Sequence, residues 1–509
     1  MPRLGLGLGL AKGSVLPTID AEALALYNRV IADGGIIPAG LDGCNNYIKS
    51  AKAARGISTL AQGYLSLAHP QYTGIRLATG TGPTAGNRAA RTVYNALGST
   101  GDFIQTTAAN QPLALVHSGT NYVWLPGVSN NNFTTPNATA NQITGDIDIK
   151  AKIDYSNNGT TQFVVSKTQT AVTNHGYDFG IDSSNLLYYQ QTRTGSFNLA
   201  SSSVGIGASY SGWVRMTRVS STGVVTFYTS SDGTTWTQLG TTSTLYTGAL
   251  DNPNAPVAIG SYFNNNNVFR GVINRVTISN SINGSAVVDF NPDSYSRATS
   301  QTTWTSATGE VWTLNTPNTN NALKAAIVDT TMIMGNGTSY GMQAASLNMN
   351  QAAITDFTAF AKYVNTAGSQ VINELGANAT AAAGKALYLN TQANQEDVWI
   401  YANVGGYNSR FTSTNLGLKL ATAVNNINNA NESSPYLINN SSQSYVASDV
   451  VNNNTANMNA TGYNLLARNN ASSLWANALM VADAVCIDEL DNTQMTSMYN
   501  FFKTYINGI

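Results

Sequence analysis

A pair of carboxyl groups that face each other across a cleft, about 5–10 Å apart, could hydrolyse a glycosidic bond, but no grouping of acidic residues in this sequence indicates such a pair. The nearest alternation is Asp146-x-Asp148, at the beginning of a predicted strand, where an aspartate in a turn is common. A second acidic group, Asp488-Glu489-Leu-Asp491, lies where a predicted strand meets a helix, and helix capping explains it. We therefore expect that the chain is not an enzyme.

The histidines do not indicate a metal or a nucleophilic site. His69, His117 and His175 are far apart in the sequence. Only His175 has a carboxylate nearby, Asp178, and a metal would need at least one more ligand. One GxSxG match surrounds Ser339, but every histidine precedes this serine, whereas the histidine of an α/β-hydrolase follows it. We interpret the match as chance in a chain rich in Gly and Ser.

The remaining candidate ligands also have simple explanations. Asp232, in a Ser-Ser-Asp-Gly turn, could ligate calcium, but an Asx-turn accounts for it. Cys44 and Cys486 lie at opposite ends of the chain without a CxxC pair, which predicts two buried free thiols. The Gly-rich segment 5–9 does not complete a GxGxxG phosphate loop. We expect no metal and no cofactor.

Aromatic residues near Asn-rich turns could recognise a sugar, by stacking on its ring while amide groups bind its hydroxyls. The same aromatics are ordinary strand residues, so a purely structural role is the alternative. The candidates for glycan contact are Tyr188, Tyr189, Tyr262, Phe263, Trp399 and Tyr401.

Composition limits the possible partners. The 509 residues suffice for about three domains of roughly 100–200 residues. Hydrophobic residues make up 42%, but charged residues only 10%, against roughly 25% in typical soluble domains. The net charge of −1 predicts no binding to nucleic acid or to an anionic membrane. No apolar run is long enough to span a membrane, and the N-terminus lacks the continuous apolar region of a signal peptide.

The elements that would position these residues are mostly strands. The stretch 213–240 predicts two strands joined by a turn at 220–223, followed by a second turn at 231–233. Further strands are expected at 146–153, 161–167, 177–181, 186–191 and 257–261. Such spacing is typical of an all-β sandwich.

Four segments together resemble the laminin-G or concanavalin A-like jelly roll of lectins, glucanases and many phage virion proteins. They are residues 119–126, 143–150, 213–240 and 269–278, and the resemblance covers roughly 119–290. It implies a jelly-roll β-sandwich. The glucanase branch carries alternating acids, Glu-x-Asp-x-(x)-Glu, on one strand, and this sequence has no such run. The fold hosts binding modules, enzymes and structural shells, so it implies no particular activity.

Two shorter segments are similar to tailed-phage proteins. Residues 20–35 resemble a segment near the N-terminus of many phage tail and virion proteins, and 106–112 are similar to a motif that precedes the first jelly-roll strand in phage and arabinofuranosidase-like chains. Their order along the chain implies a virion structural protein of fibre or appendage type.

Helices are expected at both ends of the chain. Asp20 is an N-cap for a first helix, whose apolar face would consist of Leu24, Tyr27, Val30 and Ile31. A second helix should cover 44–54. Near the C-terminus, Asp491 and Gln494 form a capping box. The apolar stripe that follows consists of Met495, Met498, Tyr499, Phe502, Tyr505 and Ile506.

An internal repeat indicates a second, diverged jelly roll. Gly119-Thr-Asn-Tyr122 is echoed by Gly337-Thr-Ser-Tyr340, and Ile143-Thr-Gly-Asp146 by Ile354-Thr-Asp356. We therefore divide the chain into an arm, a small helical or mixed attachment domain, a first sandwich and a second sandwich. Their bounds are 1–18, 19–112, 113–315 and 325–509. The arm presents Leu4, Leu6, Leu8 and Leu10 on one side and could add a strand to a partner's sheet.

Two functions fit these features. The first is a structural component of a phage virion, a fibre or surface appendage on head or tail. It would be anchored to other virion proteins through its N-terminal region, oligomeric, and able to contact host-surface glycans. The second is a secreted carbohydrate-binding protein or glycoside hydrolase of the concanavalin A-like class. The missing acidic strand, the missing signal peptide and the arm favour the first.

Overall fold

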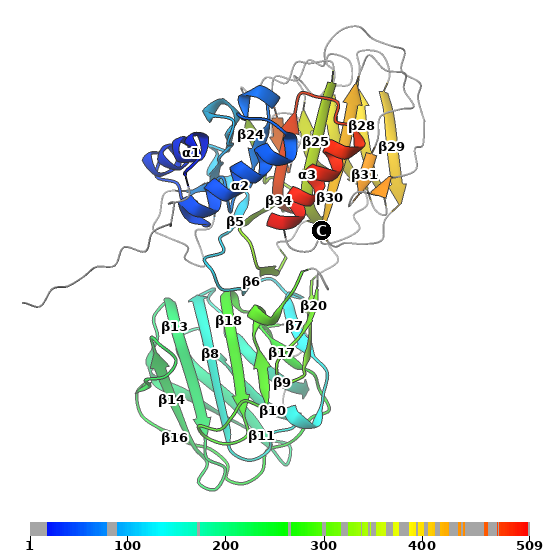
Figure 1. Cartoon of the computed structure of the whole chain (residues 1–509). Coiled ribbons are helices and arrows are strands. Elements are labelled where there is room, and N and C mark those ends of the chain that lie inside the picture. Colours follow the sequence, from blue (N-terminus) through cyan, green and yellow to red (C-terminus); the bar gives the residue numbers. More distant parts are fainter. Residues whose placement is uncertain are drawn as a thin grey trace, which may run out of the picture.

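The computed structural model describes most of the chain. The described residues are 18–78, 89–170, 174–262, 266–297, 302–316, 324–336, 338–344, 347, 353–362, 370–375, 386–392, 395–401, 406–412, 418–426, 436–438, 441–442, 463–466, 476 and 478–506. They form two lobes joined end to end through a narrow connection (Figure 1). Each lobe is a sandwich of two antiparallel sheets, so the chain is mainly β, with a small helical region at its N-terminus.

One lobe is built from a single stretch of chain, β6 to β22, and we call it the contiguous sandwich. Its first sheet has the order β15-β14-β13-β8-β18-β6-β22, with β16 beside β14 and β19 beside β18. The bounds are β15 Thr237–Gln238, β14 Val224–Ser230, β13 Ser209–Arg218, β8 Ile147–Ser156, β18 Arg270–Ser279, β6 Tyr122–Pro126, β22 Ala326–Val328, β16 Ser243–Thr244 and β19 Val288–Phe290.

Its second sheet has the order β12-β11-β10-β9-β17-β7-β21-β20. The bounds are β12 Ser196–Gly205, β11 Leu186–Arg193, β10 Asn174–Ile181, β9 Gln162–Thr170, β17 Val257–Ile259, β7 Asn132–Thr135, β21 Val311–Asn315 and β20 Thr303–Thr305. The five predicted strands of the first sandwich are therefore present, with ends shifted by a few residues.

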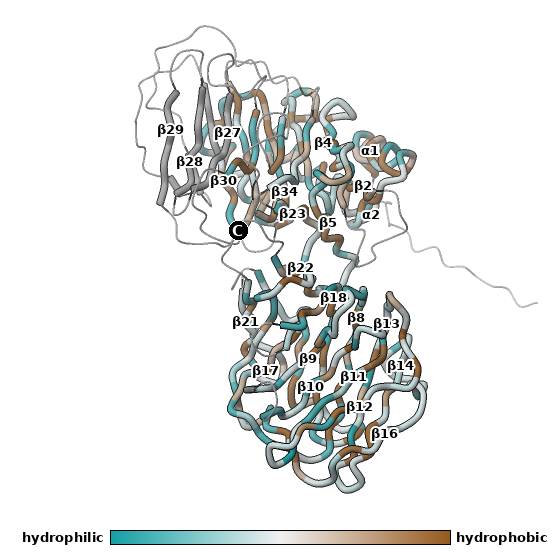
Figure 2. The backbone as a smooth tube through the Cα atoms, turned by 180° about the vertical axis from the view of Figure 1, so that it is seen from behind, coloured by the Kyte–Doolittle hydropathy of each residue, from teal (hydrophilic) through white to brown (hydrophobic). Residues whose placement is uncertain are grey.

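Alternation along the strands fills the core between these sheets. In the predicted hairpin, Val214 and Met216 of β13 are fully buried, while Arg215 and Thr217 point to the opposite face. The tube in Figure 2 changes between hydrophobic and hydrophilic along these strands. The β13–β14 pairing confirms the hairpin.

The other lobe is made of two separate parts of the chain, and we call it the divided sandwich. Its first sheet has the order β32-β31-β30-β25-β34-β23-β5, with β1 beside β34. The bounds are β32 Ser441–Ser442, β31 Tyr436–Ile438, β30 Leu418–Asn426, β25 Ala353–Lys362, β34 Ala478–Cys486, β23 Met332–Met334, β5 Leu113–Leu115 and β1 Ser66–Ala68.

Its second sheet has the order β2-β3-β4-β24-β33-β26-β27-β28-β29. The bounds are β2 Ile75–Leu77, β3 Ala90–Val93, β4 Phe103–Ile104, β24 Met342–Ala344, β33 Tyr463–Leu465, β26 Gln370–Leu375, β27 Ala386–Gln392, β28 Gln395–Tyr401 and β29 Gly406–Thr412.

The two sandwiches have the same strand order. In one sheet, β13-β8-β18-β6-β22 corresponds to β30-β25-β34-β23-β5; in the other, β11-β10-β9-β17-β7-β21-β20 corresponds to β28-β27-β26-β33-β24-β4-β3. In the sequence echo, Ile143 lies shortly before β8 and Ile354 lies at the beginning of β25. These two strands occupy equivalent central positions in their sheets. The strand order thus agrees with the predicted repeat.

The early strands differ from the expected division of the chain. β1 pairs with β34 and β4 with β24, so strands from residues 19–112 belong to the sheets of the divided sandwich and form no separate attachment domain. β5, expected in the first sandwich, pairs with β23 of the divided one, and β22, expected in the second sandwich, pairs with β6 of the contiguous one. The physical reason is that such short strands bury little surface alone, and these partners lie about two hundred residues or more away.

Two neighbouring strands connect the lobes. The path from β5 to β6 runs antiparallel to the path from β22 to β23, with pairs on both sides of the junction. Residues 116–121 of one path lie opposite only 329–331 of the other, so the ribbon carries a bulge where it crosses. A double connection restrains bending more than a single linker would.

A helical layer covers the divided sandwich only. The described α-helices are α1 Ala21–Ala32, α2 Gly40–Arg55 and α3 Asn492–Tyr505. Short 3₁₀ turns are Ala61–Gly63, Ser99–Gly101, Ala108–Asn110, Thr139–Asn141 and Pro292–Ser294. α2 and α3 lie across the sheet that contains β25 and β34 (Figure 1). No described helix has the length and hydropathy needed to cross a membrane.

The caps were predicted better than the buried face of α1. Asp20 accepts hydrogen bonds from the first turn of α1, and Asp491 and Gln494 form the capping box of α3. α1 buries Ala23, Leu26 and Val30, however, and exposes the expected face residues Leu24 and Ile31. The buried stripe of α1, which faces α2 and the sheet, includes Ala23. Choosing the face from large apolar residues alone overlooks this small side chain.

Candidate functional site

A buried polar cluster lies on the outer face of the β9–β12 sheet. Asp178 of β10 accepts a hydrogen bond from Thr168 at 2.7 Å, lies 2.8 Å from Nδ1 of His175, and accepts 3.1 Å from the Gln190 amide. His175 and Asp178 are fully buried. Because its lone pairs are satisfied, the Asp178 carboxylate is a fixed part of this face.

Aromatic rings cover this cluster. Tyr262 stacks on Phe163 at a centroid distance of 4.7 Å, and Tyr188 meets the same Phe163 edge-on at 6.0 Å. The Tyr262 hydroxyl lies 3.2 Å from Nδ1 of His175. Burial, with Asp178 nearby, raises the pKa of Tyr262 well above its usual range, so the hydroxyl stays neutral. Tyr188 and Tyr262, chosen from sequence, therefore share one surface.

This surface continues to the sheet edge. Phe197 of β12 packs against His175 at 5.4 Å, and Leu199, opposite Gln190, is 45% exposed. We call the surface the tyrosine face, consisting of Phe163, Tyr188, Phe197, Leu199 and Tyr262 over His175, Asp178 and Gln190. Sequence reasoning missed Phe163, Phe197 and Gln190. Counting alternate positions along β11 and β12 would have placed Gln190 and Phe197 there, whereas Phe163 reaches this face through a register shift in β9 that the alternation does not show.

Of the other predicted glycan residues, Tyr189 has a described side chain, and it does not join this face. Tyr189 is fully buried in the core between the sheets, because it alternates with Tyr188 along β11, so it cannot contact a ligand. Phe263 lies outside the described residues. Trp399 and Tyr401 belong to β28, whose side chains are also outside the described part.

The acidic candidates have structural partners. Asp146 accepts from Ser220, and Asp148 forms a bidentate pair with Arg215 at 2.8 Å. Asp488 pairs with Arg55. No two of these acids face each other across a described cleft.

The histidine and serine candidates are likewise separate. His69 is buried among aromatic rings, and burial lowers its pKa to about 3, as expected for a core histidine. His117 lies at the junction of the lobes, within 3.2 Å of Asn121. The amide of Asn336, not a histidine, contacts the Ser339 hydroxyl at 3.2 Å.

The turn acid and the thiols have the simple roles that the sequence predicts. Asp232 accepts from the amides of Thr234 and Thr235, which is an Asx-turn, and these bonds lower its pKa. Cys44 and Cys486 are free and buried. Within the described ranges, no three His, Cys, Asp or Glu side chains are grouped as metal ligands would be.

Comparison with known proteins gives similarity of fold alone. No known protein family matches the sequence, and no curated protein matches it either. Mouse laminin α1 domains LG4-5 superpose with a TM-score of 0.27 at 9% identity, over 75% of this chain and 96% of theirs. The heptameric SAP-like pentraxin of Limulus polyphemus gives 0.25 at 14%, over 33% of this chain and 79% of that chain.

A third solved structure is botulinum neurotoxin type C, whose cell entry depends on interaction with two ganglioside molecules. It superposes with a TM-score of 0.26 at 11% identity, over 33% of this chain. The match spans less than half of the toxin chain, 42%. All three superpositions have TM-scores below 0.5.

Proposed function

We propose that this chain is a non-catalytic structural protein of a tailed-phage virion, a fibre or appendage on head or tail, which contacts host-surface glycans through the tyrosine face. The observation that carries the glycan part is the tyrosine face itself. Its rings lie on a hydrogen-bonded base of Asp178, His175 and Gln190, so they are held in place before a ligand arrives.

The chemistry of the tyrosine face suits a sugar. Partly exposed rings of Tyr188 and Tyr262 offer flat apolar surface to the carbon–hydrogen side of a pyranose. Their neutral hydroxyls, which contact Gln190 and His175, supply polar groups at the edge of that surface. A flat site without a facing pair of carboxylates favours binding over hydrolysis.

The virion part rests on the sequence resemblance and on the architecture. The double connection between the lobes suits a projecting appendage, because it holds the contiguous sandwich at a fixed distance from the divided one. The leucine arm, outside the described residues, would add a strand to another virion protein or to a second copy of the chain. We expect a homo-oligomer located in the virion.

Glycan binding is tested with a glycan array probed by the full-length chain and by Tyr262→Ala. We expect the variant to lose roughly tenfold or more in affinity, because a central aromatic contact is removed. Tyr246→Ala is the matched control, since Tyr246 is 38% exposed and lies outside the tyrosine face. Equal binding by both variants and the unchanged chain would remove the tyrosine face from the proposal.

Anchoring is tested by light scattering of the full chain and of a chain lacking residues 1–18. A full-length oligomer that becomes a monomer on truncation supports the arm as the assembly element. Mass spectrometry of purified phage particles then checks incorporation. If the truncated chain were incorporated normally, the anchoring role of the arm would be wrong.

A further inference from the structure

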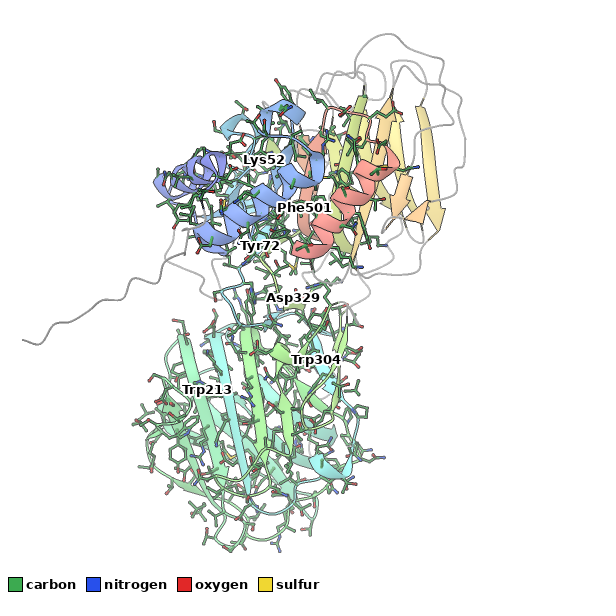
Figure 3. The ribbon with its side chains drawn as sticks, in the orientation of Figure 1. Lys52, Tyr72, Trp213, Trp304, Asp329 and Phe501 are labelled. Carbon is green, nitrogen blue, oxygen red and sulfur yellow. The ribbon has the colours of Figure 1, made fainter. Side chains whose placement is uncertain are left out.

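A polar cavity of about 370 Å³ opens at the junction of the two lobes. Its wall is formed by the loop between β1 and β2, by both strands of the connecting ribbon and by the C-terminal end of α3. The lining residues used below are Tyr72, His117, Asp329, Thr330, Lys503 and Tyr505. Figure 3 shows Tyr72 and Asp329 on either side of this junction. Ligand sites commonly lie between domains, in cavities of about 300–1,000 Å³.

The aromatic part of the wall is rigid. Tyr72 stacks on the fully buried Tyr47 with centroids 5.0 Å apart and planes 7° apart. Tyr505 meets Tyr72 edge-on at 5.0 Å, and its hydroxyl lies 2.9 Å from that of Ser50. No hydrogen bond within the described residues uses the Tyr72 hydroxyl. A half-buried ring with a free hydroxyl is therefore held at the cavity surface.

The ribbon supplies acceptors whose orientation is fixed. The guanidinium of Arg297 binds Asp329, with Nη2 2.6 Å from Oδ1, and so offsets its charge. The Asn121 amide donates to the carbonyl of Pro292, which turns its oxygen toward Nε2 of His117 at 3.2 Å. Nε2 of His117 therefore donates to the Asn121 oxygen, and Nδ1 makes no hydrogen bond within the described residues.

Lys503 gives the cavity its net charge. Lys503 is exposed at the rim of the cavity and forms no ion pair within the described part of the chain, and its ammonium lies 6.0 Å from the ring centroid of Tyr499. Because Arg297 balances Asp329, the ammonium of Lys503 is the one uncompensated charge among the lining residues named above. A polyol that carries a single negative charge matches this lining, which offers one cation, several neutral donors and acceptors, and two tyrosine rings.

We propose that this cavity binds a terminal sugar that carries one carboxylate, a sugar acid at the end of a glycan. The proposal rests on the proposed function, since it assumes that the chain binds glycans, and it adds a second site between the lobes. The carboxylate of the sugar pairs with Lys503, and its ring contacts Tyr72 and Tyr505. Its hydroxyls bind Asp329, Thr330 and Nδ1 of His117.

The test is an array of matched neutral and carboxylate-bearing glycans, probed with the full-length chain and four variants. We expect Tyr72→Ala to lower binding to the acidic glycans roughly tenfold or more. Tyr72→Phe keeps the stack on Tyr47 and removes only the hydroxyl, so it should lose less. Lys503→Gln should weaken the binding of acidic glycans roughly tenfold and leave the binding of neutral glycans unchanged. Lys152→Gln, an exposed lysine on the contiguous sandwich, is the control.

The outcomes separate the two proposals. Loss of acidic-glycan binding in the Tyr72 and Lys503 variants supports the cavity. Loss with Tyr262→Ala alone keeps the tyrosine face and overturns the cavity. Selective binding of neutral glycans, or acidic binding that survives both Lys503→Gln and Tyr72→Phe, also overturns it. The absence of any glycan binding overturns both proposals. Circular dichroism of each variant checks that it is folded.

Discussion

The contiguous and divided sandwiches share a strand order, but they treat buried charge differently. On the contiguous sandwich, Asp148 accepts hydrogen bonds from Nε and Nη2 of Arg215, each at 2.8 Å, and from the backbone amide of Asn283 at 2.9 Å. Arg215 in turn lies over the rings of Tyr228 and Trp236. Opposite charges are paired, and each carboxylate oxygen has a donor.

On β25, the equivalent strand of the divided sandwich, a buried acid shares a proton with a second acid instead of pairing with a cation. Asp356 of β25 and Asp483 of β34 are buried and form no ion pair with a cation among the described residues, and both contact the Tyr463 hydroxyl, at 3.1 and 2.6 Å. That hydroxyl has one proton, so the second contact requires a proton on a carboxyl group. The Asn373 amide donates to Asp356 at 2.8 Å. One fold therefore accommodates an ion pair on the outer face of one central strand and a protonated acid pair between the sheets on the equivalent strand.

Separating the lobes should give the largest difference between them. A fragment of residues 120–330 contains the whole contiguous sandwich and should unfold cooperatively, as measured by circular dichroism in urea. The fragment 325–509 lacks β1, β3, β4 and β5 and should remain unfolded, because two sheets lose strands and α3 loses α2. Adding residues 19–115 should restore structure. Cooperative unfolding of 325–509 alone would contradict the divided topology.

Removing one partner of the ion pair should have the next largest effect. Arg215→Met leaves the Asp148 carboxylate, whose side chain is 0% exposed, without its main partner. We expect a loss of about 3–5 kcal/mol in the free energy of unfolding of the contiguous sandwich. Arg76→Met breaks the more exposed pair with Asp33 and should cost less than about 1 kcal/mol. Similar losses in urea titrations of both variants would mean that burial of the pair is unimportant.

The acid pair should make the divided sandwich less stable as the pH rises. Burial raises the pKa of Asp356 to about 6, and burial beside Asp356 raises the pKa of Asp483 above its usual range. The folded chain then binds more protons than the unfolded chain, so this contribution is complete below about pH 4 and decreases as the pH passes 6.

Asp483→Asn measures that contribution. Relative to the unchanged chain, the variant should become steadily more stable as the pH rises from 4.5 to 7.5, because its neutral amide has no proton to lose. The difference between the two chains isolates this pair from the other carboxylates. A difference that is constant with pH would show that the two acids do not share a proton in the folded state.

The smallest expected effect concerns the helical layer, which only the divided sandwich has. Asp491→Ala removes the side chain that accepts from the Gln494 amide at 2.8 Å, and it should cost about 1 kcal/mol. Asp491→Asn should retain most of that stability, since its amide oxygen can still cap α3. Thermal unfolding of the two variants makes the comparison.

Local signals predicted the class of fold and much of the candidate site. Alternation and turns located the strands of the contiguous sandwich, and the proximity of His175 to Asp178 along the chain became a direct contact at 2.8 Å. Tyr188 and Tyr262 lie on one face, as a shared glycan site requires. Tyr189 was a wrong choice because neighbouring residues of a strand point to opposite faces.

The divided topology was beyond local signals. The three residues of β5 pair with Met332–Met334, and nothing in the sequence around Leu113 names that partner. The same limit hid the cavity, because His117, Asp329 and Lys503 come together only through the crossing of the ribbon and the placement of α3. The pairing of Asp356 with Asp483 depends on the same long-range contacts.

The two-stranded ribbon has a consequence for how the chain finds its fold. β5 has to pair with β23, and closing a free loop as long as the intervening chain would make this pairing entropically costly. Once the contiguous sandwich has formed, β22 lies beside β6, so the ends of that long loop are already together. The search that remains is across the few residues of the bulge. Folding of the contiguous sandwich thus removes most of the loop-closure entropy from the pairing of β5 with β23, and we expect this pairing to form as readily as a local contact.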